Sequence, residues 1–296
     1  MSAAVLQGKL SCAKKGIAFC KNQLCSAATK FKAALAGSDY EECLTINDGS
    51  ENDGDDDDGF DDANCDSTGD CSDDKIANNN VPTVQDNVEV LGEEILHCDT
   101  FSWKFPVEIS QSTLDGRNGS SACSVIALIF AHQVWHGRLN LQRTPSLSPL
   151  WVMLLCSSIK VGSRLYDCCR QSLPQRFLSA SEAATVAEQC VSVTVHSPLA
   201  VRVRDDHAPT TLVYQLSALC DGTQGNAALL IANEKTVLFL ALAGQSIAMV
   251  DTHRHGAYGA EILLGRQRNL HQFLGACQKV LDLNDDTYGN LSFIAF

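Results

Sequence analysis

The stretch from Asp115 to Gly137, DGRNGSSACSVIALIFAHQVWHG, contains the features on which the fold and the chemistry of this chain depend. The turn-forming residues 115–119 precede two small serines that can cap a helix. An apolar run from Ala122 to Trp135 then has the length of a helix, and Gly137 suits its C-terminal end. The pattern predicts a buried helix with Cys123 in its first turn.

The position of Cys123 matters chemically. Unpaired backbone N–H groups and the positive end of the helix dipole favour a thiolate at a helix N-terminus. They lower the pKa of a cysteine there below its ordinary value of about 8.5. Cys123 is therefore a candidate nucleophile. The alternative is that Cys123 is simply a small apolar residue at a helix start, and most of the other thirteen cysteines are expected to be simple apolar residues as well.

Composition excludes some classes of function. The chain has 296 residues, a net charge of −13 and an isoelectric point near 4.9, which argue against general nucleic-acid binding. No uninterrupted apolar segment has the length of a membrane span, and no secretory signal is evident, so we expect neither a membrane partner nor secretion.

The cysteines indicate the compartment. Several of them are scattered through apolar stretches, which predicts reduced thiols of an intracellular protein, in cytoplasm or nucleus, rather than a disulfide framework. No CxxC pair is followed by a matching pair, so we expect no zinc site and no cofactor.

The N-terminal part has a different character from the rest. Residues 1–86 form a leader in which the segment from Asp48 to Asp74 carries thirteen acidic residues and no lysine or arginine. Such a block repels itself and buries too little apolar surface to fold, so residues 48–80 are predicted to be a disordered acidic linker. A second region, 87–296, is predicted to form one domain beginning near Val88.

Hydrophobic patterning predicts helices first and a sheet later. The expected helices are 122–135, 150–159, 179–191, 210–219 and 269–281, and the expected strands of the C-terminal third are 227–232, 236–242, 246–250 and 291–296. Shorter extended segments are expected at 102–109, 191–195 and 201–204, and 88–98 is compatible with either a helix or a strand. This order favours an α+β fold, with the Cys123 helix packed on an antiparallel, meandering sheet.

An acidic residue and two histidines follow one of the expected strands. In SIAMVDTHRHG, Asp251 and His253 are two residues apart, so both side chains would point to one face of a regular strand. A carboxylate beside an imidazole fixes its tautomer and stabilises the imidazolium. A helix cysteine with a distant Asp-x-His is the pattern of a thiol nucleophile and its general base.

Other interpretations of the histidines stay open. His255 could replace His253 as the base. His132 and His136 lie four apart on the expected Cys123 helix and could face a metal, but they lack a HExxH frame. Asp-x-His could also be a hydrogen-bonded strand end.

Four residues together resemble the papain-like ubiquitin-specific peptidases of herpesvirus large tegument proteins. The chain has a cysteine opening a buried helix, Asp-x-His at a later strand end, and Gln111 a dozen residues before the cysteine. The resemblance implies a papain-like fold with Cys123 as nucleophile, His253 as base, Asp251 as its orienting group and Gln111 in the oxyanion hole. Residues 115–121 depart from the viral pattern, so Asn118 or the Cys123 backbone N–H could be the oxyanion donor instead.

The resemblance implies a thiol-dependent hydrolase that cleaves ubiquitin or a ubiquitin-like protein from conjugates. Two alternatives use the same fold. The first is a catalytically inactive protein that binds a protein partner, and the second is an acyltransferase with the same triad.

Overall fold

The computed structural model describes residues 88–95, 99–170, 173, 176–188, 190–204, 206 and 208–296. The predicted leader, residues 1–86, lies outside them. Within the described residues the strands are β1 (Gly92–Ile95), β2 (Thr100–Lys104), β3 (Thr194–Val195), β4 (Leu199–Arg202), β5 (Ala227–Ala232), β6 (Lys235–Leu242), β7 (Ser246–Asp251), β8 (Glu261–Arg266) and β9 (Tyr288–Ala295). The α-helices are α2 (Cys123–His136), α3 (Pro149–Cys169), α4 (Ala180–Ala187), α5 (Leu212–Cys220) and α6 (Leu270–Leu281), and two short 3₁₀ turns are η2 (Leu114–Gly116) and η4 (Gln267–Asn269).

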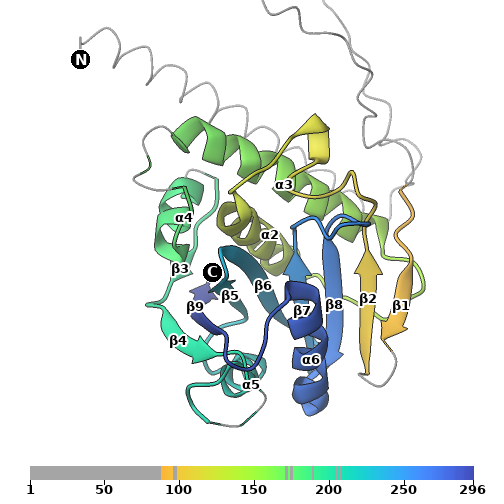
Figure 1. Cartoon of the computed structure of the whole chain (residues 1–296), viewed down its shortest axis with the longest axis vertical. Helices are drawn as coiled ribbons and strands as arrows, with labels where there is room; N and C mark the ends of the chain where they lie inside the picture. Colours follow the sequence, from red (N-terminus) through yellow and green to blue (C-terminus); the bar gives the residue numbers. More distant parts are fainter. Residues whose placement is uncertain are drawn as a thin grey trace, which may run out of the picture.

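The strands form one antiparallel sheet in the order β1-β2-β8-β7-β6-β5-β9-β3, and β4 also pairs with β9. The consecutive strands β5, β6 and β7 are neighbours, which is the meander expected from their short turns, and β8 pairs with β7 after a longer connection. The chain thus has an α+β fold, shown in Figure 1.

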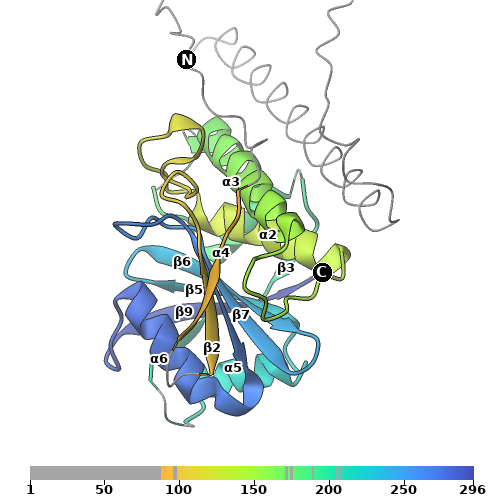
Figure 2. The same cartoon turned by 90° about the vertical axis from the view of Figure 1, so that its right-hand side faces the viewer.

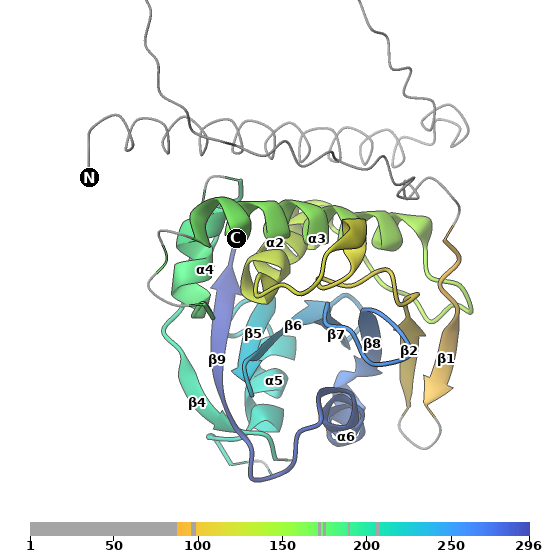
Figure 3. The same ribbon diagram turned by 45° about the horizontal axis from the view of Figure 1, so that its top comes forward.

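Helices cover both faces of the sheet. Figures 2 and 3 show α2, α3 and α4 on one side and α5 and α6 on the other. Each side has its own apolar core, because alternate side chains of the central strands point to opposite faces. Leu238 and Leu240 of β6 face α2, whereas Val237 and Phe239 face α5 and α6.

Helix α2 is the most deeply buried helix of the chain's described part. Its residues from Cys123 to Ala131 are all buried, because α3 and α4 cover the side that the sheet leaves open. Gly162 of α3 allows this contact: a Cβ built at Gly162 would lie 2.6 Å from Cγ1 of Ile126 and 2.9 Å from its Cα. The close packing fixes the axis of α2 and therefore the position of Cys123.

Several sequence predictions need correction. The Cys123 helix has the predicted length, but its N-cap is Ala122 with no side-chain cap; the serine hydroxyl of Ser120 instead accepts from the Ala122 N–H at 3.2 Å. Helix α3 is twice as long as the predicted 150–159, and the predicted strand 191–195 is reduced to two residues.

The sheet also differs from the prediction of helices first and strands later. β1 and β2 precede every described α-helix, and they join the sheet through β8, a strand that the sequence analysis did not assign. β8 ends in Gly265-Arg266 and shows no polar alternation, since both of its faces are buried up to Gly265. The helical first half and the sheet are therefore interleaved.

Candidate active site

Two segments that are distant in sequence meet at one end of the sheet. Cys123 opens α2, Asp251 ends β7, and His253 lies in the turn that follows. The thiol of Cys123 hydrogen-bonds the ring of His253, whose Nδ1 lies 2.5 Å from Oδ1 of Asp251. The structure thus brings together the three residues that the sequence singled out.

The turn, rather than a shared strand face, aligns Asp251 with His253. β7 ends at Asp251, so the argument from strand alternation does not apply to His253. The backbone N–H of His253 donates to Oδ1 of Asp251 at 2.9 Å, and the ring Nδ1–H donates to the same oxygen. This carboxylate is fully buried and holds both the backbone and the ring of His253. Nε2 is left as the ring nitrogen that can serve Cys123.

The electrostatics favour an ion pair between Cys123 and His253. Burial alone would raise the pKa of the Cys123 thiol, but the hydrogen bond and charge of His253 hold it below its ordinary value. Burial would lower the pKa of His253, yet the charge and hydrogen bond of Asp251, with a further contribution from Cys123, raise it to about 10. The pKa of Asp251 is depressed despite burial, because His253 and His255 favour its carboxylate. These directions describe a thiolate and an imidazolium supported by a carboxylate.

Thr236 is a site residue that the sequence analysis missed. Its side chain and its backbone N–H both hydrogen-bond Cys123 and lower the pKa of the thiol. Its hydroxyl also lies 2.7 Å from the hydroxyl of Ser124, which in turn lies within 3.2 Å of the Leu178 carbonyl oxygen. A threonine at the start of an apolar strand gives no local signal for this role, because the contact depends on how the β5–β6 hairpin meets α2.

The register of the hairpin explains why the Thr236 N–H is available. Asn233 and Glu234 form a two-residue turn with positive φ values of 47° and 61°, and Ala232 pairs with Lys235 to close it. In an antiparallel ladder the next pair directs its N–H groups away from the partner strand, so the Thr236 N–H points away from β5. On that side the pairing with β7 begins only at Leu238, which leaves the N–H for Cys123.

Gln111 hydrogen-bonds both the turn that carries His253 and the loop before Cys123. Its backbone N–H donates to the Thr252 carbonyl at 2.8 Å, and the Thr252 hydroxyl donates to Oε1 of Gln111 at 3.0 Å. The Gln111 amide Nε2 reaches the Ser120 carbonyl at 3.5 Å, three residues before Cys123. Gln111 is buried, whereas the alternative Asn118 is exposed on the loop. The contacts therefore place Gln111, rather than Asn118, beside the turn of Asp251 and His253.

His255 contacts the same carboxylate from the other side. Its Nε2 lies 3.0 Å from Oδ2 of Asp251, although the ring is not aligned for a hydrogen bond. The ring stacks on Tyr258 with centroids 5.0 Å apart, and the Tyr258 hydroxyl donates to Glu261 at 2.7 Å. Cys123 hydrogen-bonds His253, whereas His255 is held between Asp251 and Tyr258. The geometry therefore makes His253 the candidate base.

The remaining ligand candidates do not assemble into a metal site. The rings of His132 and His136 are 4.1 Å apart, and burial together with His136 lowers the pKa of His132 to about 4. In the part of the chain that the structure describes, no three His, Cys, Asp or Glu side chains are grouped to hold a metal ion.

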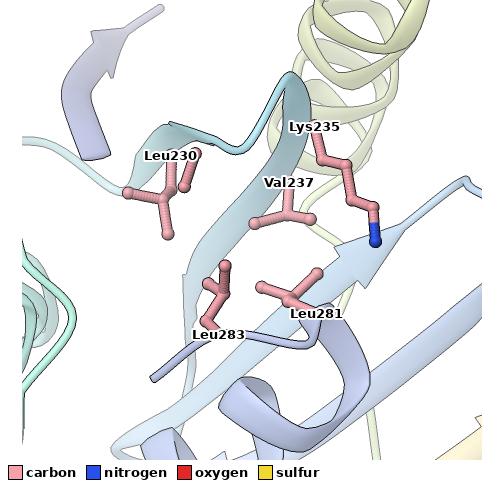
Figure 4. A pocket seen from close by; sticks show the side chains of 6 residues that line it. Leu230, Lys235, Val237, Leu281 and Leu283 are labelled. Atoms are coloured by element: carbon pink, nitrogen blue, oxygen red, sulfur yellow. The ribbon is translucent and has the colours of Figure 1, made fainter. Parts of the chain in front are cut away.

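The surroundings of the triad are closed. Cys123 is 5% exposed, and the Asp251 side chain is fully buried. The hollow drawn in Figure 4 is a separate feature, on the α6 side of β5 and β6 and lined by residues such as Leu230, Val237 and Leu281. Its volume of about 10 Å³ is that of a single water.

No protein-family model and no curated protein sequence matches the chain. Among solved structures, the chain is similar to the ubiquitin-specific protease encoded by murine cytomegalovirus tegument protein M48, determined in complex with a ubiquitin-based suicide substrate. The two are 10% identical with a TM-score of 0.46, and the match covers 64% of this chain and 84% of the viral one.

Across the described residues, no helix has both the length and the apolar character needed to cross a membrane.

Proposed function

We propose that the chain is a papain-like cysteine hydrolase that cleaves ubiquitin or a ubiquitin-like protein from its conjugates. The observation that carries the chemistry is that His253 bridges Cys123 and Asp251 within one buried cluster. The substrate class follows from the resemblance of Cys123, Gln111 and the Asp-x-His turn to the herpesvirus peptidases.

In the proposed reaction the Cys123 thiolate attacks the carbonyl carbon of the last glycine of ubiquitin. A C–S bond forms, and the carbonyl oxygen becomes an oxyanion that the Gln111 amide and the Cys123 backbone N–H stabilise. The His253 imidazolium then gives its proton to the leaving amine, and the C–N bond breaks. His253 then takes a proton from water, whose oxygen attacks the thioester carbonyl carbon. The C–S bond breaks, the ubiquitin carboxylate is released, and the Cys123 thiolate and the His253 imidazolium are regenerated.

Ubiquitin carrying a C-terminal electrophile tests this proposal directly. We expect the full chain to gain the mass of one probe, and Cys123→Ser to gain none. Cys156→Ser is the matched control, because Cys156 is similarly buried but burial raises the pKa of its thiol to about 12. This control should react like the natural chain.

The same experiment separates the hydrolase from the catalytically inactive alternative. Absence of an adduct, together with saturable non-covalent binding of ubiquitin, would show a protein-binding module and reject the hydrolase. An adduct that forms equally well on Cys123→Ser would move the nucleophile elsewhere.

A further inference from the structure

The turn that carries His253 continues into a tight hairpin before β8 begins. The His255 N–H donates to the Tyr258 carbonyl at 2.9 Å, and the Tyr258 N–H donates to the His255 carbonyl at 3.2 Å. Gly256 supplies the positive φ of 55° between them. β8 then starts at Glu261. Whatever holds Tyr258 in place therefore also limits how far His253 can move.

The side chain of Tyr258 is anchored on a buried carboxylate. Its hydroxyl donates to Oε2 of Glu261 at 2.7 Å, and the Ser102 hydroxyl donates to Oε1 of Glu261 at 2.6 Å. Glu261 is 1% exposed and accepts on both oxygens, so an ionised carboxylate matches its two donors. Hydrogen bonds to a charged group are stronger than those between neutral groups. The bond from Tyr258 to Glu261 is thus a strong constraint on the turn.

The strand register places this carboxylate beside the triad. Asp251, the last residue of β7, pairs directly with Glu261, the first residue of β8. Residues directly opposite each other carry Cβ atoms about 4.5–5.5 Å apart on one face of a sheet. Tyr258 therefore holds the far end of the turn against the strand that neighbours Asp251.

The surroundings of Tyr258 keep its phenol neutral. The ring stacks on that of His255, and the Lys104 ammonium lies 5.4 Å from the ring centroid. Burial, followed by the hydrogen bond and charge of Glu261, raises the pKa of Tyr258. The hydroxyl thus stays a donor at neutral pH, and its one proton is used in the bond to Glu261.

We propose that Tyr258 is a positioning residue, whose hydroxyl bond to Glu261 holds the turn of residues 252–258 so that His253 meets Cys123. This role rests on the proposed function, because it serves the Cys123–His253 pair of that reaction. Without the hydroxyl the ring still packs, but the turn is free to move relative to β8, and His253 moves with it.

The pH dependence of Cys123 alkylation by iodoacetamide tests this role without a ubiquitin substrate. Tyr258→Phe keeps the ring and removes only the hydroxyl. Its pH midpoint should rise by about half a unit to one unit, a roughly three- to tenfold slower alkylation below the midpoint, because a displaced His253 stabilises the thiolate less. Tyr214→Phe removes the hydroxyl of a tyrosine that is 42% exposed on α5, and this matched control should keep the natural profile.

A double variant shows whether the hydroxyl acts through Glu261. Glu261→Gln replaces one acceptor oxygen by an amide group that donates, so it should also raise the midpoint. Combining it with Tyr258→Phe should add little to the larger single effect, because the two groups form one bond. If Glu261→Gln fails to fold, Tyr258→Phe compared with Tyr214→Phe carries the test alone. A natural pH midpoint in Tyr258→Phe, even with a lower thermal midpoint, would overturn the proposal.

The electrophilic ubiquitin probe keeps this test separate from that of the proposed function. If the natural chain is not labelled but Tyr258→Phe shifts the alkylation midpoint, the hydrolase is rejected and the positioning role stands. If the natural chain is labelled and Tyr258→Phe has the natural midpoint, the positioning role is rejected and the hydrolase stands.

Discussion

At the scale of single residues, three similarly buried cysteines differ in what surrounds their sulfur atoms. Cys123 has His253 and Thr236 as hydrogen-bond partners, whereas burial raises the thiol pKa of Cys156 to about 12 and that of Cys277 well above its ordinary value. We therefore expect iodoacetamide at low dose to modify Cys123 first, with a pH midpoint below the ordinary value of about 8.5. Peptide mapping by mass spectrometry measures the three rates in one sample. Equal rates for the three cysteines would contradict a thiolate at Cys123.

The hydroxyl of Thr236 should contribute to that thiolate. The Thr236 side chain hydrogen-bonds Cys123 and lowers the pKa of its thiol, and this bond uses the proton of the threonine hydroxyl. Thr236→Val removes this donor and keeps the backbone N–H, so alkylation of Cys123 at neutral pH should fall about tenfold, the equivalent of ~1.4 kcal/mol. Thr236→Ser should restore the rate. A valine variant with the natural pH profile would show that the hydroxyl is only structural.

Asp251 and His253 should act as one unit. Asp251→Asn should keep the fold but reduce turnover of a ubiquitin conjugate by about two to four orders of magnitude, because the amide cannot stabilise the imidazolium. His253→Ala should lose at least as much, and the double variant little more. His255→Ala should reduce turnover only slightly, since His255 does not reach Cys123. Turnover and thermal midpoint measured on the same variants distinguish chemistry from folding; a large loss in His255→Ala with a small one in His253→Ala would reassign the base.

The sequence could predict residues whose chemistry is visible locally. A cysteine at the start of an apolar helix and an aspartate two residues from a histidine are recognisable by type and order, and the structure places them together. Thr236 and Thr252 could not be found in this way. Their contacts with Cys123 and Gln111 arise where β6 and the turn after β7 meet other segments, and neither residue type is unusual there.

At the scale of elements, the contact between α2 and α3 should be intolerant of one added methyl group. Gly162→Ala should destabilise the fold by about 1–3 kcal/mol, because the new Cβ would overlap Ile126 and displace α2. Gly275→Ala is the matched control, since Gly275 lies in α6 with open space around it and should gain about 0.5–1 kcal/mol from helix propensity. Urea unfolding measures both changes. Stabilisation of both variants would mean that the two helices can separate freely.

Patterning predicted most helices and the β5–β7 meander but not how the sheet is completed. Amphipathic helices such as α6 can be predicted from the helical spacing of their apolar residues, and the start of α4 from the Ser179–Glu182 capping box. β8 lacks alternation because both of its faces are covered, and its pairing with β2 joins residues more than 150 positions apart. Such long-range pairing leaves no local periodic signal.

At the scale of the whole molecule, the described fold is anchored at its N-terminal side by a few residues just after position 87. Val90 is 1% exposed, and its carbonyl accepts from the Leu147 N–H at 2.9 Å, while the Gly92 N–H donates to Pro145 at 2.7 Å. These bonds fasten the strand β1 to the segment that leads into α3. The acidic segment from Asp48 to Asp74 offers little apolar surface for packing onto this core.

Deleting residues 1–86 should therefore leave the thermal midpoint and the alkylation rate of Cys123 nearly unchanged. Deleting residues 1–91 is the matched control: it removes the buried Val90 side chain, whose burial contributes about 1.5–3 kcal/mol, and should lower the midpoint by roughly 4–10 °C. Calorimetry of the full chain and of both truncations compares them directly. An insoluble or partly unfolded 87–296 chain would show instead that the leader packs onto the domain, and would reject the predicted boundary. Equal stability of the two truncations would place the start of the folded core after Val90.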